Sequence, residues 1–200
     1  MKAIVYSSVT RGYDTFKPGR DIWFIDSQYV IGNPKLQVRY PKICIQELVD
    51  VDYSLYLDGS VNLKPGISIH ELIDIYLSGG NDLAIVKHPE RDCLYDEGEA
   101  IVRLEKESNS LLVDKQLERY RRLEHPEHWG LARCGIILRR HTRDTRLLGL
   151  RWWDELCNGT QRDQVSFPFV LRNSEVKFRM FRDTSWFDVE KHARKGMGFP

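Results

Sequence analysis

Short apolar runs recur along the first 140 residues of the chain and are separated by longer amphipathic stretches. Such runs, bounded by polar, Gly or Pro residues, are typical of buried strands. They occupy residues 2–9, 21–26, 53–57, 83–86 and 132–138. Strands that alternate with helices favour a mostly parallel sheet with helices on both faces. We therefore predict one α/β domain that spans residues 1–200.

The clearest helix signal follows a capping pattern, with Ser68 as the N-cap and Glu71 three residues later. Apolar residues then recur at helical spacing, at Ile69, Leu72, Ile73 and Tyr76. The pair Gly79-Gly80 is expected to end this helix. Helices are also predicted at residues 43–49, 94–107, 112–123 and 147–156. Residues 27–41 contain one glycine and two prolines, so we predict mostly loop there.

Composition limits the class of protein more than its activity. With a net charge of +1, the chain has no overall field that selects a polyanionic partner, although a local basic patch is compatible with it. No apolar run approaches the roughly 20 residues of a membrane span. The first residues also lack the pattern of a signal peptide, so we predict a cytoplasmic protein with no membrane partner.

The four cysteines are widely spaced, which disfavours a zinc site and favours buried free thiols. Two disulfides are the alternative for a secreted protein.

Polar clusters follow three of the predicted strands. The carboxyl ends of strands in an open α/β sheet face the ligand crevice. The clusters are Thr10-Arg11-Gly12-Tyr13-Asp14, Asp58-Gly59-Ser60 and Lys87-His88-Pro89-Glu90-Arg91. No GxGxxG or GxxxxGK(S/T) pattern accompanies them, so neither a dinucleotide fold nor a P-loop is supported. Taken alone, Asp58-Gly59 is more typical of a turn, and Arg91 of a surface ion pair.

Three later segments are compatible with more than one role. His125 and His128 have metal-ligand spacing, but we expect a solvated loop because no third ligand adjoins them. A basic cluster follows the last predicted strand and consists of Arg139, Arg140, His141, Arg143 and Arg146. It is interpreted either as a nucleic-acid contact or as a solvated face partly paired with Asp144. Of Trp152 and Trp153, at most one can face a ligand, because neighbouring helical residues point apart.

Four stretches, taken in this order, resemble a known family. They are the opening strand with Thr10–Asp14, then Tyr53–Ser60, Lys87–Glu97, and Trp152–Glu155 with Gln161–Phe167. The most specific patterns are HPxRDCxYxE and WWxE…RDQxSF. Together they resemble the glycosyltransferase-like family of the plant turgor-regulation and seed-mucilage proteins, formerly a domain of unknown function. The resemblance covers roughly residues 1–175.

This resemblance implies a glycosyltransferase of the GT-A type with a Rossmann-like sheet. It implies a nucleotide-sugar-binding half at residues 1–100 and an acceptor-side half with a C-terminal tail at residues 101–200. In that fold an Asp-x-Asp element after a central strand holds a divalent metal on the donor diphosphate. Here the element reads Asp58-Gly59-Ser60, so a hydroxyl replaces the second carboxylate. Mn²⁺ or Mg²⁺ would then be held by Asp58, Ser60 and His192, since such ions keep waters and use substrate phosphates.

The resemblance also assigns roles to the other polar clusters. The implied donor-binding residues are Thr10, Arg11, Gly12, Tyr13, Asp14, Asp58, Lys87, His88 and Arg91. Asp163 is the candidate acceptor-side carboxylate and would act as a general base in an inverting enzyme. In a retaining enzyme, Asp163 or Gln164 would only orient the sugar. Arg162 would hold Asp163 in place through an ion pair.

The predicted function is transfer of a sugar from a nucleotide sugar, with a UDP-sugar as the expected donor, to a glycan or to DNA. The basic cluster from Arg139 to Arg146 is the predicted DNA contact. The alternative is a non-catalytic protein that binds nucleotide sugars or nucleic acid through a degenerate metal site. Ser60, in the place of a second acid, is the feature that favours this alternative.

Overall fold

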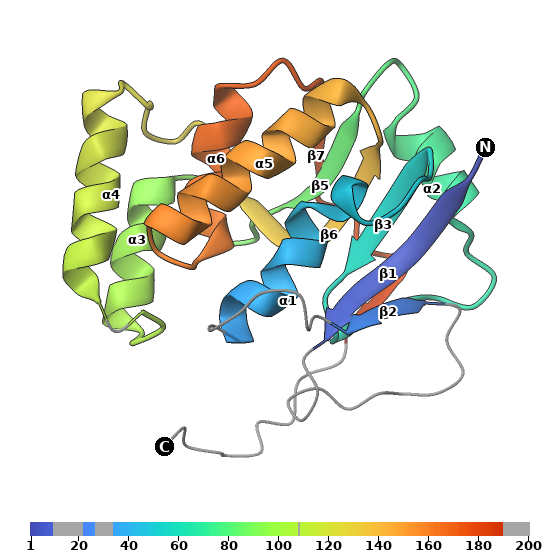
Figure 1. The fold of residues 1–200 in the computed structure, drawn as a ribbon, viewed down its shortest axis with the longest axis horizontal. Coiled ribbons are helices and arrows are strands. Elements are labelled where there is room, and N and C mark those ends of the chain that lie inside the picture. The colour runs from blue at the N-terminus through green and yellow to red at the C-terminus, as the bar shows by residue number, and fades with distance from the viewer. Residues whose placement is uncertain (10–21, 27–33, 108, 190–200) are drawn as a thin grey trace.

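The computed structural model describes residues 1–9, 22–26, 34–107 and 109–189, and its centre is a six-stranded sheet (Figure 1). The strands are β1 (Ala3–Val9), β2 (Trp23–Asp26), β3 (Tyr53–Leu57), β5 (Leu83–Lys87), β6 (Ala132–Arg140) and β7 (Phe178–Phe181). Their order across the sheet is β2-β1-β3-β6-β5-β7. β6 is antiparallel to its neighbours β3 and β5, and the other neighbouring pairs are parallel. The predicted mostly parallel α/β fold is thus confirmed, with one antiparallel strand inside the sheet.

Helices cover both faces of this sheet, as predicted. One face packs against α1 (Pro34–Ile43), α5 (Arg143–Asn158) and α6 (Asp163–Arg172). The other packs against α2 (Ile69–Tyr76) and a small antiparallel sheet of β4 (Val61–Leu63) and β8 (Phe187–Val189). Figure 1 shows α1 and α5 in front of the sheet, with α3 (Leu94–Arg103) and α4 (Ser110–Arg122) at one end. A short 3₁₀ helix, η1 (Ile45–Glu47), follows α1.

The central strands are apolar on both faces because each face is covered. In β3, Tyr56 packs into the core beneath α1, α5 and α6, whereas Leu55 and Leu57 pack beneath α2. Successive side chains of a strand point to opposite faces, so one strand supplies both cores. Strands of this kind lie between layers, and their carboxyl ends are free to form a site.

Local signals in the sequence determine several elements. At the start of α2, the backbone N–H of Glu71 donates to Ser68 Oγ at 3.2 Å, and the backbone N–H of Ser68 donates to a Glu71 carboxylate oxygen at 2.7 Å. Gly79 and Gly80 follow that helix with φ values of 78° and 84°. These left-handed conformations suit glycine. The predicted helix and its ends are confirmed.

The prediction of mostly loop over residues 27–41 is wrong for the described part, because α1 begins at Pro34. A proline is tolerated at the first helical position, where its missing N–H has no partner to lose. Pro41 lies within the last turn of the same ten-residue helix. The short strands β4, β7 and β8 were not predicted either, since each has only three or four residues.

The two predicted halves share one sheet, because β6, from the second half, lies between β3 and β5 of the first. All four cysteines are free thiols; Cys44, Cys93 and Cys134 are buried and Cys157 is exposed. Among the described residues, no helix combines the length and apolar character that crossing a membrane requires.

Candidate functional site

A pocket of about 310 Å³ opens where β3 ends. Its walls come from α1, β3, β6 and the start of α6. The lining residues are Val38, Arg39, Lys42, Tyr56, Asp58, Arg133, Cys134, Gly135, Arg162, Asp163 and Gln164. The fold therefore brings together Asp58 and the predicted catalytic group Arg162, Asp163 and Gln164.

Asp58 follows β3 directly and is held against β6. Its backbone N–H donates to the Gly135 carbonyl at 2.8 Å, and its Oδ1 accepts a hydrogen bond from the Tyr56 hydroxyl at 2.9 Å. A Cβ atom on Gly135 would lie 2.8 Å from Asp58 Oδ2, so only glycine leaves room for the carboxylate at this point of β6. Burial, and then the charge of Asp58, raise the pKa of Tyr56, which keeps its hydroxyl protonated as a donor.

Lys42, near the end of α1, is the central cation of the pocket. Only 5% of this residue is exposed, and its Nζ lies 2.6 Å from Asp163 Oδ2 and 3.5 Å from Asp58 Oδ1. Burial alone would lower the pKa of Lys42, but the two carboxylates outweigh it and the net shift is upward. Lys42 therefore stays charged at neutral pH. It connects Asp58, after the C-terminal end of β3, with Asp163, at the N-terminus of α6. Lys42 was not predicted as a site residue, because nothing near it in the sequence indicates its partners.

Asp163 is the first residue of α6 and is also buried. Burial favours the neutral acid, but the charges of Lys42 and Arg39 outweigh burial and lower the pKa of Asp163 to about 2. Its Oδ1 accepts a hydrogen bond from the backbone N–H of Gln164 at 3.1 Å. A helix N-terminus also favours negative charge. The carboxylate is thus fixed in its ionised form, paired with Lys42 rather than with Arg162.

Side chains from β1 and β6 form hydrogen bonds with the backbone carbonyls at the C-terminus of α1. The Tyr6 hydroxyl donates to the Lys42 carbonyl at 3.1 Å. The Arg139 guanidinium donates to the carbonyls of Lys42 at 2.6 Å and Ile43 at 2.8 Å. A cation at a helix C-terminus donates hydrogen bonds to the free carbonyls and interacts favourably with the negative end of the helix dipole. These contacts hold the backbone from which Lys42 reaches the pocket.

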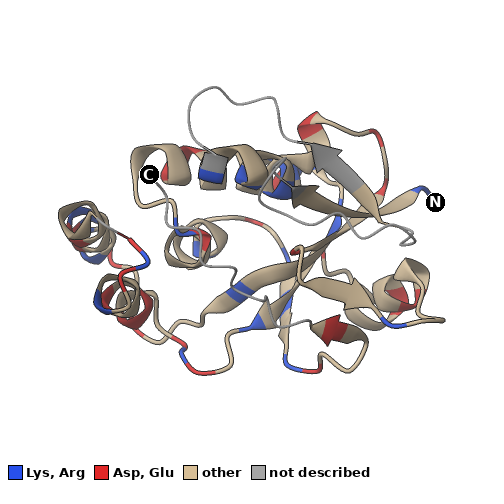
Figure 2. Ribbon diagram, turned by 90° about the horizontal axis from the view of Figure 1, so that it is seen from below, with Lys and Arg blue, Asp and Glu red and all other residues tan. Residues whose placement is uncertain are grey.

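This role of Arg139 corrects the prediction of a basic patch for DNA. Arg139 is only 4% exposed, and Arg146 is bound to Glu47 with an Nη2–Oε2 distance of 2.8 Å. Arg140 lies over the Tyr53 ring at 5.5 Å, which leaves Arg143 as an exposed arginine of this cluster. Figure 2 shows basic and acidic positions interspersed over the described elements. Arg139 is thus a structural residue, and Arg146 is held in a surface ion pair.

We expect Arg139→Met to lower the free energy of unfolding by about 2–4 kcal/mol, because charge-assisted hydrogen bonds are worth about 1.5–3 kcal/mol each and the freed carbonyls stay buried. Urea unfolding at pH 7 measures the change. The exposed neighbour Arg143→Met is the matched control and should change stability by less than about 0.5 kcal/mol. Unchanged stability in Arg139→Met, together with weakened and strongly salt-dependent DNA binding, would restore the nucleic-acid interpretation.

The loop between α5 and α6 is positioned by a buried network around Glu155. The Tyr120 hydroxyl donates to Glu155 Oε2 at 2.6 Å, and Gln116 Nε2 donates to the same oxygen at 3.3 Å. Gln116 Oε1 accepts from the backbone N–H of Thr160 at 2.8 Å, and Thr160 Oγ1 accepts from the backbone N–H of Arg162 at 3.3 Å. This chain of bonds runs from Glu155 in α5 through Gln116 in α4 to Arg162, the residue before α6. It links the WWxE and RDQxSF patterns.

The pocket carries an excess of positive charge. Four of its lining residues are basic and two are acidic. Lys42 is paired with the two carboxylates, and the other three basic residues are Arg39, Arg133 and Arg162. Among the described residues, these arginines form no ion pair within 4 Å. Arg39 Nη1 donates to the Lys35 carbonyl at 2.9 Å, whereas the Nε atoms of Arg39 and Arg162 are buried and have no hydrogen-bond partner among the described residues.

The predicted donor-binding cluster at Lys87–Arg91 lies outside the pocket lining. His88 Nδ1 accepts a hydrogen bond from the backbone N–H of Arg91 at 3.0 Å. Arg91 Nε donates to the buried Glu97 at 2.7 Å, so its main partner is neither Asp92 nor Glu90. The backbone N–H of His88 donates to the Leu131 carbonyl at 2.8 Å, immediately before β6. Burial lowers the pKa of His88. The hydrogen bonds of His88 and Arg91 stabilise this segment.

Only Asp58 of the predicted metal set lines the described pocket. Asp58 offers one carboxylate, and its Oδ1 is shared with Tyr56 and Lys42. Asp163 is ion-paired, and Ser60 does not line the pocket. His192 and the predicted nucleotide loop Thr10–Asp14 lie outside the described residues. A divalent ion at Asp58, Ser60 and His192 stays a prediction, and no chemical step is assigned to it.

The paired tryptophans belong to the packing of the protein. Trp152 is buried, and its Nε1–H donates to Ser166 Oγ at 3.2 Å. Trp153 packs edge-on against Tyr40, with ring centres 5.0 Å apart. Neither lines the pocket.

The prediction of a solvated loop is wrong for His125, which is 5% exposed.

Comparison with known proteins identifies a family and a fold. The model of the "TOD1/MUCI70, glycosyltransferase-like domain" family matches residues 25–195. One relative from Arabidopsis thaliana, "Alkaline ceramidase TOD1", is 29% identical over 164 residues, which are 74% of this chain and 34% of that protein. Another from the same plant, "Probable hexosyltransferase MUCI70", is 26% identical over 159 residues, which are 74% of this chain and 26% of that protein. The chain spans about a third or less of the length of these curated relatives.

A solved structure has the same overall arrangement. It is the crystal structure of a glycosyltransferase involved in the glycosylation of the major capsid of PBCV-1. The TM-score is 0.52, and the match covers 91% of this chain and 82% of that one at 12% sequence identity. At this identity the likeness concerns the fold alone.

Proposed function

Because this chain belongs to the TOD1/MUCI70 glycosyltransferase-like domain family, we propose that it transfers a sugar from a nucleotide-sugar donor bound in the pocket at Asp58. The observation that carries the proposal is the buried Lys42, held between Asp58 and Asp163 in a pocket with three further arginines. Positive side chains of this kind bind a diphosphate, and carboxylates beside them bind the hydroxyls of a sugar.

The donor diphosphate is assigned to the arginine side of the pocket. Guanidinium groups bind phosphate oxygens in a bidentate way, and Arg39, Arg133 and Arg162 are the candidates. During transfer, the bond between the anomeric carbon and the diphosphate oxygen breaks, a bond to an acceptor oxygen forms, and the proton of the acceptor hydroxyl passes to the leaving diphosphate. Negative charge then builds up on the leaving diphosphate. Fixed cations stabilise that charge without having to reorganise, which is the role proposed for these arginines and for Lys42.

Asp163 is proposed to orient Lys42 and the donor sugar. A general base works best when its pKa is near the operating pH, whereas the pKa of Asp163 is lowered to about 2 by Lys42 and Arg39 against the effect of burial. A carboxylate this weakly basic is a poor acceptor for the proton of an acceptor hydroxyl. This supports the orienting role for Asp163, with Gln164 beside it at the start of α6.

A glycan is the proposed acceptor. The predicted DNA contact is not kept, because Arg139 supports α1 and Arg146 pairs with Glu47. One relative is described as a ceramidase, but six charged residues line the pocket of this chain. A charged pocket suits a nucleoside diphosphate better than an acyl chain, since apolar surface gains free energy only when it leaves water for apolar surroundings.

The experiment is a thermal-shift panel of UDP, GDP, CDP and dTDP compounds, with Mn²⁺ or with a chelator, followed by a donor-hydrolysis assay. A ligand present at 100 times its dissociation constant stabilises the native state by about 2.7 kcal/mol. We expect a UDP-sugar to raise the melting temperature. Arg162→Gln should weaken its binding by about 10–100-fold, the equivalent of one charge-assisted contact.

The exposed Arg122→Gln is the matched control and should bind the donor as the unaltered chain does. Asp58→Asn should still bind nucleotide but lose turnover. Binding without turnover in the unaltered chain would favour the non-catalytic alternative. If no nucleoside diphosphate or nucleotide sugar shifts the transition in either buffer, the donor assignment is wrong.

A further inference from the structure

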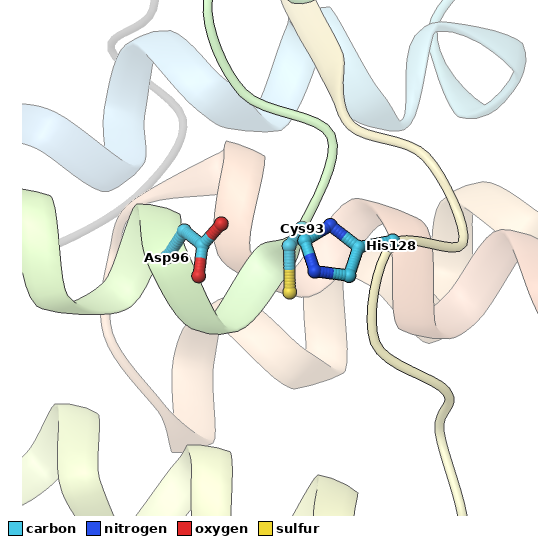
Figure 3. Close-up of side chains that lie close together, drawn as sticks. All are labelled: Cys93, Asp96 and His128. Carbon is cyan, nitrogen blue, oxygen red and sulfur yellow. The ribbon is translucent and has the colours of Figure 1, made fainter.

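We propose that Cys93, Asp96 and His128 form a zinc-binding site that is separate from the pocket at Asp58. One possible ligand atom from each residue lies within 4.8 Å of those of the other two. Cys93 immediately precedes α3, Asp96 lies in its first turn, and His128 comes from the segment between α4 and β6. Figure 3 shows the His128 ring beside the Cys93 thiol, with its two nitrogens on the side toward Cys93. None of the three lines the pocket.

The types of ligand select zinc. A thiolate is a soft ligand that disfavours Mg²⁺ and Ca²⁺, whereas thiolate, imidazole and carboxylate all bind Zn²⁺. Cys93 and Asp96 lie at the N-terminus of α3, where the helix dipole favours negative charge. Three protein ligands leave a fourth tetrahedral position for water. Asp96 and His128 are exposed, so a metal ion can reach the site from solvent.

A second carboxylate supports the histidine. Asp92 Oδ1 lies 2.7 Å from His128 Nδ1, so that nitrogen donates its proton and the Nε2 lone pair is left for a metal. Metal-binding histidines nearly always have such a partner, because it fixes the tautomer and the ring orientation.

The two chain segments are already joined at this point. The backbone N–H of Gly130 donates to the Asp92 carbonyl at 2.9 Å, and that of His88 donates to the Leu131 carbonyl at 2.8 Å. His128 has a φ of 53°, an uncommon conformation for a residue with a side chain. Such conformations persist where the surrounding contacts impose them, and they cluster at ligand sites.

Only a small movement is needed to close the site. Zinc bond lengths of about 2.0–2.3 Å place tetrahedral ligand atoms roughly 3.3–3.6 Å apart. Cys93 is buried, and rotation of the exposed Asp96 side chain, with a small shift of the His128 ring that keeps its bond to Asp92, supplies the remaining ångström. The bound ion would clamp the segment before α3 to the segment before β6. This revises the expectation from the sequence that the cysteines and His128 bind no metal.

The test uses the untagged protein after treatment with a chelator. Titration with Co²⁺ should produce a thiolate-to-cobalt charge-transfer absorption at one equivalent, and Zn²⁺ should displace it. Zn²⁺ should also raise the melting temperature, since it binds the native state. We expect Cys93→Ser to abolish the absorption. His128→Gln should weaken Zn²⁺ binding by at least about tenfold, and the supporting Asp92→Asn by about 10–100-fold.

Two controls keep the same residue types away from the site. Cys157→Ser and His70→Gln alter an exposed cysteine and an exposed histidine outside the cluster, and both should bind Co²⁺ and Zn²⁺ normally. Asp58→Asn should also keep the absorption, which separates this site from any ion at the donor pocket. If Cys93→Ser fails to fold, the exposed positions His128 and Asp96 decide the question. No charge-transfer absorption, or Zn²⁺ affinity unchanged in both His128→Gln and Asp96→Asn, would overturn the proposal.

Discussion

Lys42→Met is expected to lower the free energy of unfolding by about 3–5 kcal/mol at pH 7, because removal of one partner leaves the buried Asp163 carboxylate without its counter-charge. Lys42 Nζ lies 2.6 Å from that carboxylate, and both residues are less than 10% exposed. Methionine has a similar length and keeps the packing, so the loss reports charge rather than volume. Denaturant unfolding at pH 7 measures it.

The size of this loss should depend on pH in a defined direction. The pKa of Asp163 is lowered from its ordinary value of 3.8 to about 2, so its contribution to stability is present above the ordinary value and is lost as pH falls toward 2. A shift of this size corresponds to about 2 kcal/mol. The pKa of Lys42 is raised, so its contribution is complete below 10.5 and is lost only at higher pH. We therefore expect the difference between the two proteins to shrink between about pH 5 and about pH 2.

Two further variants isolate the pair. The double variant Lys42→Met/Asp163→Asn removes both charges and should recover much of the stability, since the cost arises from the unpaired partner. The exposed Lys115→Met should change stability by less than about 0.5 kcal/mol. Additive losses in the double variant, or a difference that does not vary with pH, would show that Lys42 and Asp163 are not paired in solution.

Gly135→Ala is expected to reduce kcat/KM by about 100-fold, because a displacement of about 1 Å in an active site has effects of that order. The added Cβ would meet Asp58 Oδ2 at 2.8 Å, which forces the carboxylate to move. The backbone N–H of Asp58 is bonded to the Gly135 carbonyl at 2.8 Å, so the backbone is held in place and the side chain has to rotate. The loss in stability should be smaller, about 1–2 kcal/mol, as for other overpacked positions.

Gly98→Ala is the matched control for steric strain alone. Its Cβ would meet the Leu117 side chain at 2.5 Å in the contact between α3 and α4, away from the pocket. It should lower the melting temperature and leave kcat/KM of the folded protein unchanged. Donor turnover and thermal unfolding of both variants provide the comparison. Equal turnover in Gly135→Ala and the unaltered chain would mean that the position of Asp58 is not critical for the reaction.

The candidate site was predictable only in part. Asp58 and Asp163 could be proposed because they adjoin recognisable patterns, a strand followed by a turn and the RDQxSF motif. Lys42 was missed, although it is the residue that joins them. It lies 121 positions before Asp163, in a helix that its prolines concealed. Arg139 was misassigned for a related reason, since its neighbours in the sequence are basic and its partners are carbonyls at the end of α1.

By itself, the sequence determined the features that depend on neighbours along the chain. The apolar runs determined β1, β3, β5 and β6, and the pair Ser68 and Glu71 determined the start of α2, because strand and helix periodicity and helix capping act over a few residues. Only the tertiary structure decided that β6 runs antiparallel between β3 and β5, and that Lys42 is buried against two carboxylates. It also decided that His88 and Arg91 bond within their own segment, outside the lining of the pocket. The physical reason is that burial and charge pairing depend on which segments meet in space, and these meetings leave no local trace in the sequence.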